Sequence, residues 1–372
     1  MTGGRRLGCL LGDGIGPEVV PAARRVVDAA LSAAGAPAVE WVDLPMGAAA
    51  LAEHGAPLPA PTLEALAGCD GWLAGPHDSE SYPPQWRASG QRVPGGELRH
   101  VFGLHTNLRP SRTRPGVPAR VPAMDLVVVR ENSEGFYADR NMAVGSGEFM
   151  PTPDLALVVG VFSRPAVRRA VRQAFALAAR RRGQVTLVHK ANVLHLAFGL
   201  WLEECRAAAR EHPGVRLETV LFDAMAARLV RHPERFDVVV TENLFGDTLS
   251  DLAGELAGAL GMSGSVNAGD RHAMAQAAHG SAPDIAGQDV ANPVGMVVSA
   301  AMLLAWLGER HADPVLAAAS SAVEQAVDAV LASGVATRDV GGTAGTAEFT
   351  DAVVDRLSAP GAAAPAVGRP GA

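Results

Sequence analysis

Short runs of β-branched and other apolar residues alternate with longer segments of helical periodicity along most of this 372-residue chain. The expected strands span residues 7–11, 71–74, 126–130, 185–189, 219–222 and 236–241. The expected helices span residues 17–34, 165–182, 196–212, 249–260, 293–311, 314–333 and 348–357. This alternation predicts an α/β fold in which helices cover a largely parallel sheet. Segment 76–122 is turn-rich and polar, so we expect loops there that help to form a site.

The composition excludes several classes of protein. A formal net charge of −7 without a basic block argues against nucleic acid or an anionic membrane as a partner. The most apolar stretch, 294–307, is too short to span a bilayer and reads as a buried helix. Cys9, Cys69 and Cys205 form no CxxC pair, which favours a reduced, cytoplasmic protein.

Lysine is almost absent from the chain. Lysine and arginine together number 32, and Lys190 is the only lysine. Arginine can replace lysine as a surface cation, but a guanidinium cannot lose its proton near neutral pH as an amine can. We therefore predict a chemical role for Lys190, with a chance survivor as the alternative.

A glycine-rich segment, GDGIGPE at residues 12–18, lies between the first expected strand and helix. Its glycines are spaced G-x-G-x-G, and no acidic residue completes the Rossmann dinucleotide pattern. Taken alone, the segment fits a phosphate-binding loop or a tight strand-to-helix turn about equally well.

Acidic residues follow two of the expected strands. Asp247 and Asp251 are four residues apart at a predicted helix start, so both carboxylates lie on one helix face. Asp223 follows the strand at 219–222 in the same way. Oxygen ligands at the carboxyl ends of strands suit Mg²⁺ or Mn²⁺. The alternative for the pair is helix capping.

Three arginines lie at a strand end or in the turn-rich segment: Arg99, Arg109 and Arg130. Each could be a surface residue, but Arg130 ends an apolar strand. Such arginines suit a di- or tricarboxylate, which they bind through paired hydrogen bonds.

Seven motifs occur in one order between residues 12 and 293. They are GDGIGPEVV, LR and NLRP ten residues apart, VVVRENSEGFY, HKANV, DAMA, NLFGDTLSD and HGSAPDIAGQDVANP. In this order the chain resembles the β-decarboxylating dehydrogenases of the isocitrate/isopropylmalate family, closest in type to NAD-dependent isopropylmalate- or tartrate-like members. The resemblance implies a two-domain, non-Rossmann α/β fold with parallel or mixed sheets flanked by helices. It divides the chain into a cofactor-binding domain (1–104 plus 258–360), a substrate, metal and dimerisation domain (105–257) and a disordered tail (361–372).

The resemblance also assigns roles to the residues that carry it. Arg99, Arg109 and Arg130 would hold the malate carboxylates. Asp247 and Asp251 would bind Mg²⁺ or Mn²⁺ together with Asp223 of a second subunit in a homodimer. The acid–base pair would be Tyr137 and Lys190, with Lys190 also reaching across the interface.

The cofactor implied by the resemblance is NAD. Its binding residues would be Gly12, Asp13, Gly14, Ile15, Asn192, His279, Gly280, Ser281, Ala282, Pro283, Asp284, Ile285 and Asn292. Asp284 would accept hydrogen bonds from the adenosine ribose and repel a 2′-phosphate. NADP-using relatives carry Lys-Tyr where this chain has Asp284-Ile285.

The chain departs from the family around the substrate. Gly95 and Gly96 stand where isopropylmalate enzymes place leucines, and Arg92 lies three residues further back. Gln276 replaces a usual glutamate, and Thr248 a usual aliphatic residue. The two glycines predict a pocket open to larger or polar substituents.

In the alternative view of these glycines, His105 or Tyr82 fills the space beside them. The leading prediction is oxidation and decarboxylation of an isopropylmalate-like 3-substituted malate. Tartrate, malate, homoisocitrate or isocitrate are alternative substrates on the same machinery. A hydride-only dehydrogenase and an inactive regulatory subunit are the alternatives outside that chemistry.

Overall fold

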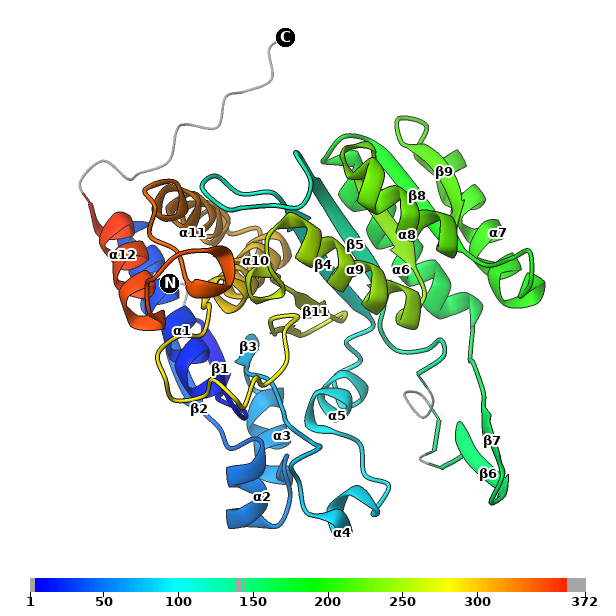
Figure 1. The fold of residues 1–372 in the computed structure, drawn as a ribbon, viewed down its shortest axis with the longest axis horizontal. Coiled ribbons are helices and arrows are strands. Elements are labelled where there is room, and N and C mark those ends of the chain that lie inside the picture. Colours follow the sequence, from blue (N-terminus) through cyan, green and yellow to red (C-terminus); the bar gives the residue numbers. More distant parts are fainter. Residues whose placement is uncertain (1–3, 138–141, 144, 360–372) are drawn as a thin grey trace.

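A ten-stranded sheet runs through the molecule in the computed structural model, which describes residues 4–137, 142–143 and 145–359 (Figure 1). The strands are β1 Arg6–Leu10, β2 Glu40–Asp43, β3 Gly71–Ala74, β4 Thr106–Arg112, β5 Asp125–Glu131, β6 Glu148–Thr152, β7 Leu155–Val158, β8 Gln184–His189, β9 Arg216–Leu221, β10 Val238–Thr241, β11 Val266–Ala268 and β12 Ala273–Ala275. The helices are α1 Gly16–Ala33, α2 Ala48–His54, α3 Ala60–Ala67, α4 Pro84–Arg87, α5 Pro94–Val101, α6 Arg164–Ala179, α7 His195–Glu211, α8 Phe222–Arg231, α9 Asn243–Ala257, α10 Val294–His311, α11 Pro314–Ala332 and α12 Thr346–Ser358.

The strand order in the large sheet is β2-β1-β3-β12-β11-β4-β5-β10-β8-β9. Both outer parts are parallel, and β11 and β4 make the antiparallel pairings in the middle. This mixed sheet with helices packed on it confirms the predicted fold class.

All the predicted strands and helices are present, with shifted ends. The largest shift is in α9, which begins six residues before the predicted start at 249 because the Glu242 carboxylate caps it by accepting from the backbone N–H groups of Leu244 and Phe245. Capping by Asp247 and Asp251 is therefore wrong. Gly246 lets α9 approach β5, since a Cβ there would lie 2.8 Å from the Cβ of Arg130.

The expectation of loops over 76–122 is wrong in part. This segment contains α4, α5 and β4. β4 has the sequence TNLRPSR, whose polar residues and proline hide the strand pattern, and it gains its regular structure by pairing with β5 and β11. β11 and β12 were missed because three-residue strands are too short to show an alternation.

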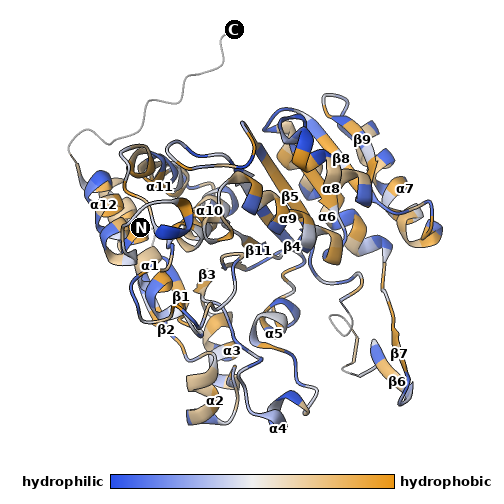
Figure 2. Ribbon diagram, viewed as in Figure 1, coloured by the Kyte–Doolittle hydropathy of each residue, from blue (hydrophilic) through white to orange (hydrophobic). Residues whose placement is uncertain are grey.

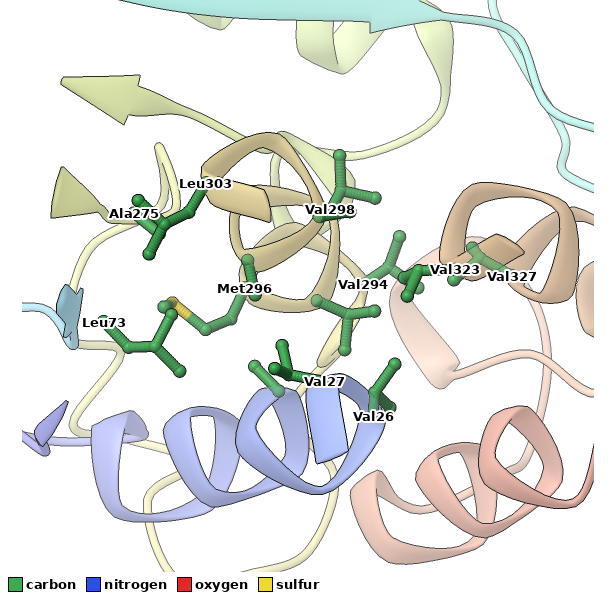
Figure 3. Close-up of a cluster of buried hydrophobic side chains, with 14 of the residues drawn as sticks. Val26, Val27, Leu73, Ala275, Val294, Met296, Val298, Leu303, Val323 and Val327 are labelled. Carbon is green, nitrogen blue, oxygen red and sulfur yellow. The ribbon is translucent and has the colours of Figure 1, made fainter. Parts of the chain in front are cut away.

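The largest hydrophobic cluster joins the two ends of the chain. α1 packs against α10, α11 and α12, and Figure 3 shows Val26 and Val27 facing Val294 and Met296. By length and composition α11 is the one described helix that could cross a membrane. It packs against α1, α10 and α12 and buries its apolar face on them.

Two further clusters contain only residues between 105 and 257. This grouping matches the predicted domains, although the sheet is continuous across them, so the division stays a prediction. The predicted tail, 361–372, lies outside the described residues.

A two-stranded hairpin, β6–β7, projects away from the body (Figure 1). All of its strand residues are exposed. The large hydrophobic residues among them are Phe149, Met150, Leu155, Leu157 and Val158. Figure 2 colours part of this hairpin as hydrophobic.

Candidate active site

The predicted arginines and the acidic pair meet where β4, β5 and α9 pack together. Arg109 on β4 donates to Asp251 at 3.0 Å and lies 3.1 Å from Asp247, both on α9. Arg130, at the end of β5, donates to the same Asp247 oxygen. The two arginines are buried, and the two aspartates are partly exposed. The structure thus brings four of the predicted site residues together.

The two aspartates differ in their ionisation. Burial opposes the charge on Asp247, but Arg130 and Arg109 outweigh it and lower the pKa of this carboxyl. Burial and the neighbouring Asp247 raise the pKa of Asp251 despite Arg109. The two carboxylates provide oxygen ligands for a hard divalent cation, and such a cation would reduce the repulsion between their charges.

Each of the three arginines is held at its Nε by a fully buried asparagine. Asn107 accepts from Arg109 at 2.7 Å. Asn243 accepts from Arg130 at 2.8 Å, and Asn267 accepts from Arg99 at 3.1 Å. A neutral amide fixes the guanidinium plane without cancelling its charge, so the Nη groups remain oriented toward the site.

Sequence reasoning missed these asparagines. Asn107 carried a usable signal, since it lies two residues before Arg109 on the same face of one strand. Asn243 and Asn267 reach their arginines over 113 and 168 residues of sequence, which no local pattern reveals.

Tyr137 joins the same cluster. Its hydroxyl donates to Asp247 Oδ2 at 2.5 Å. The guanidinium of Arg130 lies over its ring, 5.5 Å from the centroid. The hydroxyl proton is thus held beside the acidic pair.

Lys190 and Asp223 form a separate pair at the ends of β8 and β9. Lys190 Nζ donates to Asp223 Oδ1 at 2.5 Å, and this bond lowers the pKa of Asp223. The Asp223 side chain is 66% exposed. In the described part of a single chain, Asp223 is the only ion-pair partner of Lys190, and no group of three acidic, His or Cys side chains could hold a metal. Asn192, two residues after Lys190, is also exposed.

The side chain of Asp13 anchors the glycine-rich loop to neighbouring segments. Its carboxylate accepts from the N–H groups of Ala48 and Asp78 and from the hydroxyl of Tyr82, at 2.7–2.8 Å. These bonds occupy the Asp13 side chain, so its contribution is to shape the loop. Gly14 has a φ of 56°, and a Cβ there would lie 1.9 Å from the carbonyl oxygen of Ser281.

The second predicted cofactor segment, residues 279–292, lies beside that loop. Ile15 N–H donates to Ser281 O at 2.8 Å. Glu18, in the first turn of α1, accepts from the N–H groups of Gly287 and Asp289 at 2.5 and 3.0 Å. The two segments predicted to bind NAD are therefore joined into one surface, and Glu18 is a joining residue that the sequence did not single out.

Members of this second segment differ in exposure. Asp284 is exposed, and its carboxylate has no hydrogen-bond partner among the described residues. His279 is partly buried, and this burial lowers the pKa of its ring. Asn292 is buried, donates to Asp339 and accepts from Val294 N–H. Its amide is thus engaged within the protein.

The space beside Gly95 and Gly96 is not filled by His105 or Tyr82, as the alternative prediction had it. A Cβ on Gly95 would lie 3.0 Å from His77 Cε1, whereas a Cβ on Gly96 would meet only Val93, at 3.5 Å. His105 pairs instead with Asp270, and Tyr82 with Asp13. The space at Gly95 is therefore filled by His77, and not by His105 or Tyr82.

Arg92 contacts the segment that follows Tyr137. It donates to the carbonyl oxygen of Met142 at 2.8 Å and lies 3.5 Å from Glu97 Oε2. The hydroxyl of Thr248 donates to the carbonyl oxygen of Leu244, one turn earlier in α9.

The model of the family described as isocitrate/isopropylmalate dehydrogenase matches residues 6–353. The chain belongs to this family. It is 42% identical to the isocitrate/homoisocitrate dehydrogenase of Thermus thermophilus, over 94% of this chain and 98% of that protein. It is 38% identical to the 3-isopropylmalate/3-methylmalate dehydrogenase of Methanocaldococcus jannaschii, over 93% and 97%. The crystal structure of isocitrate dehydrogenase from Methylococcus capsulatus superposes with a TM-score of 0.84 at 36% identity, covering 95% of this chain and all of that one.

Membership confirms the resemblance read from the seven motifs. The family comprises decarboxylating hydroxy-acid dehydrogenases, which generally use a divalent metal and NAD or NADP. The chain is accordingly an oxidoreductase of this class.

Proposed function

We propose that this protein catalyses the NAD- and Mg²⁺- or Mn²⁺-dependent oxidative decarboxylation of an isopropylmalate-like 3-substituted malate to a 2-oxo acid and CO₂. The observation that carries the proposal is the cluster of Arg109, Arg130, Tyr137, Asp247 and Asp251. It combines carboxylate-binding arginines, oxygen ligands for a cation and a proton donor in one place.

The residues of this cluster, together with Lys190 from the separate pair, would act as follows. A bound divalent cation would lower the pKa of the substrate 2-hydroxyl, and NAD⁺ would accept the hydride from C2. Arg109 and Arg130 would turn their Nη groups to a substrate carboxylate once the aspartates have another counter-charge. Lys190 would accept the hydroxyl proton. After the 3-carboxylate leaves as CO₂, Tyr137 would protonate C3.

The donor set supports a metal held between two subunits. Asp247 and Asp251 supply two carboxylates on one helix face, and the described residues of a single chain offer no third acid beside them. Asp223 is exposed and paired with Lys190, so it is available to a second subunit.

A homodimer is also supported by exposed apolar surface close to Lys190. Val193, Leu194 and Leu196 are exposed at the start of α7, and the β6–β7 hairpin is exposed throughout. We propose that a second copy covers these residues. The free, buried thiols of Cys9, Cys69 and Cys205 support a cytoplasmic location.

NAD is the proposed cofactor because Asp284 presents a free carboxylate to solvent in the segment that adjoins the glycine-rich loop. Such a carboxylate can accept from both ribose hydroxyls and repels a 2′-phosphate. The wild type should strongly prefer NAD⁺, and the double variant Asp284→Lys, Ile285→Tyr should narrow or reverse that preference. Comparable kcat/KM for both nucleotides in the wild type would contradict the assignment.

Homoisocitrate or isocitrate is the second candidate substrate. It is favoured by the open space at Gly96 and by the similarity to the isocitrate/homoisocitrate dehydrogenase of Thermus thermophilus. Tartrate and malate are the smaller alternatives.

The test of the proposed function is a substrate panel with the purified homomer, Mn²⁺ and each nucleotide. We expect reduced NAD and CO₂ in equal amounts from a 3-substituted malate. Reduced NAD without CO₂ would indicate hydride transfer alone. No turnover of any panel member would indicate a regulatory subunit.

A further inference from the structure

Gln276 uses both ends of its side-chain amide inside the protein. It follows β12 directly, and its side chain is buried. Oε1 accepts from Nη2 of Arg99 at 3.0 Å, and Nε2 donates to the carbonyl oxygen of Gly75 at 3.2 Å. Its backbone N–H donates to Ser265 O at 3.1 Å, so the residue is fixed at its main chain as well.

The two partners of this amide belong to different halves of the proposed site. Arg99 lies in the last turn of α5. Burial raises the pKa of Asp247, and the charge of Arg99 adds a smaller contribution to the lowering by Arg130 and Arg109. Gly75 follows β3, and the carbonyl of its neighbour Pro76 accepts from Asp13 N–H in the glycine-rich loop at 2.8 Å. Gln276 therefore connects a substrate arginine to the base of the proposed nucleotide site.

Only a neutral amide satisfies both partners. A glutamate could accept from Arg99, but it has no hydrogen to donate to Gly75 O and would place a negative charge against that carbonyl oxygen. It would also add a carboxylate beside Arg99 that competes with the carboxylate of the substrate. A glutamate at this position would therefore differ from Gln276 in both charge and donor capacity.

We propose that Gln276 is a positioning residue that orients Arg99 for a substrate carboxylate and, through its neutrality, strengthens the binding of anionic substrates. The proposal rests on the proposed function, which places a hydroxy di- or tricarboxylate at Arg99. Gln276→Glu should raise KM for the substrate about 10-fold or more, since a charge-assisted hydrogen bond to the substrate is weakened. KM for NAD⁺ should change less than KM for the substrate.

A pH series separates charge from structure. Lowering the pH protonates the introduced carboxyl, so the KM defect of Q276E should shrink as the pH falls. Q276L loses both hydrogen bonds without gaining a charge, so its KM defect should not share this pH dependence. Thermal melting of each variant reports any loss of folding.

Gln184 offers a matched control. It is buried to a similar extent, at 8% exposure against 7% for Gln276, and its Oε1 also accepts from an arginine, Arg216, at 2.7 Å. It lies at the first residue of β8, away from the strand end that carries Lys190. Gln184→Glu should leave KM for the substrate within about twofold of the wild type.

Calorimetric titration of malate into each variant measures dicarboxylate binding without turnover. This keeps the inference testable if the wild type fails to turn over the substrate panel, an outcome that would overturn the proposed function alone. The positioning role is overturned if Q276E binds and turns over dicarboxylates like the wild type. It is also overturned if Q184E shows the same KM defect, or if the defect of Q276E does not respond to pH.

Discussion

Asp247 follows β10 and Asp223 follows β9, two strands of one sheet that are separated by β8, and the surroundings of the two residues differ sharply. Asp247 lies between two buried arginines and the hydroxyl of Tyr137. The Asp223 side chain is mostly exposed, and among the described residues its ion-pair partner is Lys190. The same reasoning from strand ends predicted a metal ligand at both positions. The difference fits the proposed homodimer, in which one half of the site would be assembled within a chain and the other half would be completed by a second copy.

The strongest test of this comparison is subunit complementation. Lys190→Arg keeps the charge but removes a titratable amine, so kcat should fall roughly 10²-fold or more. Asp247→Asn should also abolish most activity, because it removes a proposed metal ligand. A mixture of the two inactive variants, refolded together, should regain about a quarter of wild-type activity, since half of the dimers would carry one intact site of two.

Two results would break the comparison. A mixture as inactive as its components would place Lys190 and Asp247 in sites within single chains. Lys190→Arg activity within threefold of the wild type would remove the acid–base role altogether.

Metal dependence is the next largest expected effect. Chelation should abolish turnover, and Mn²⁺ should restore it. Asp251→Asn and Asp223→Asn should each raise the Mn²⁺ concentration needed for half-maximal rate by about 10-fold or more, because each removes a proposed oxygen ligand. Glu255→Gln, one turn after Asp251 on the same helix, is the control and should leave this concentration unchanged. An unaltered Mn²⁺ requirement in Asp223→Asn would show that the exposed half contributes no metal ligand.

Asp247 and Asp223 are both proposed metal ligands, but their removal should affect the stability of the protein differently. Asp247→Asn removes a carboxylate charge that lies against the buried guanidinium groups of Arg109 and Arg130, and it should lower the free energy of unfolding by about 3 kcal/mol in metal-free buffer. Asp223→Asn, on the surface, should leave it nearly unchanged. Chemical denaturation of both variants measures this difference, and equal losses would contradict the contrast between a completed and an exposed half.

The smallest predicted effect concerns Gly95, where His77 fills the space, and Gly96, where the space is open, in the proposed substrate pocket. Gly95→Leu would push against His77 and should destabilise the protein by about 1–3 kcal/mol. Gly96→Leu has room and should shift the ratio of kcat/KM toward isopropylmalate over tartrate by about 10-fold, through added apolar contact. Thermal melts and the substrate panel check the pair, and a Gly96→Leu protein with unchanged preference would place the pocket elsewhere.

Within the site, residues of reactive type were the ones that the sequence could predict. Lys190, Tyr137 and Asp247 were identifiable because their chemistry is uncommon or their motifs are specific. The residues that hold the arginines of the site were not, because Asn107, Asn243 and Gln276 have side chains that any loop or strand can carry. Their function depends on what lies within about 3 Å, and hydrogen-bond partners distant in sequence leave no periodic signal.

The sequence alone determined the α/β class, the positions of the long helices and the family. Hydrophobic periodicity is a local property, and seven motifs in one order are independent of how the chain folds back on itself. Only the tertiary structure decided that β4, β11 and β12 complete the centre of the sheet. These strands are short or polar, and they become regular through hydrogen bonds to strands far away in the chain. The tertiary structure also decided that His77 fills the space at Gly95 and that Asp223 faces solvent. Packing and exposure depend on what the rest of the chain brings to a residue, which its own neighbours in sequence do not specify.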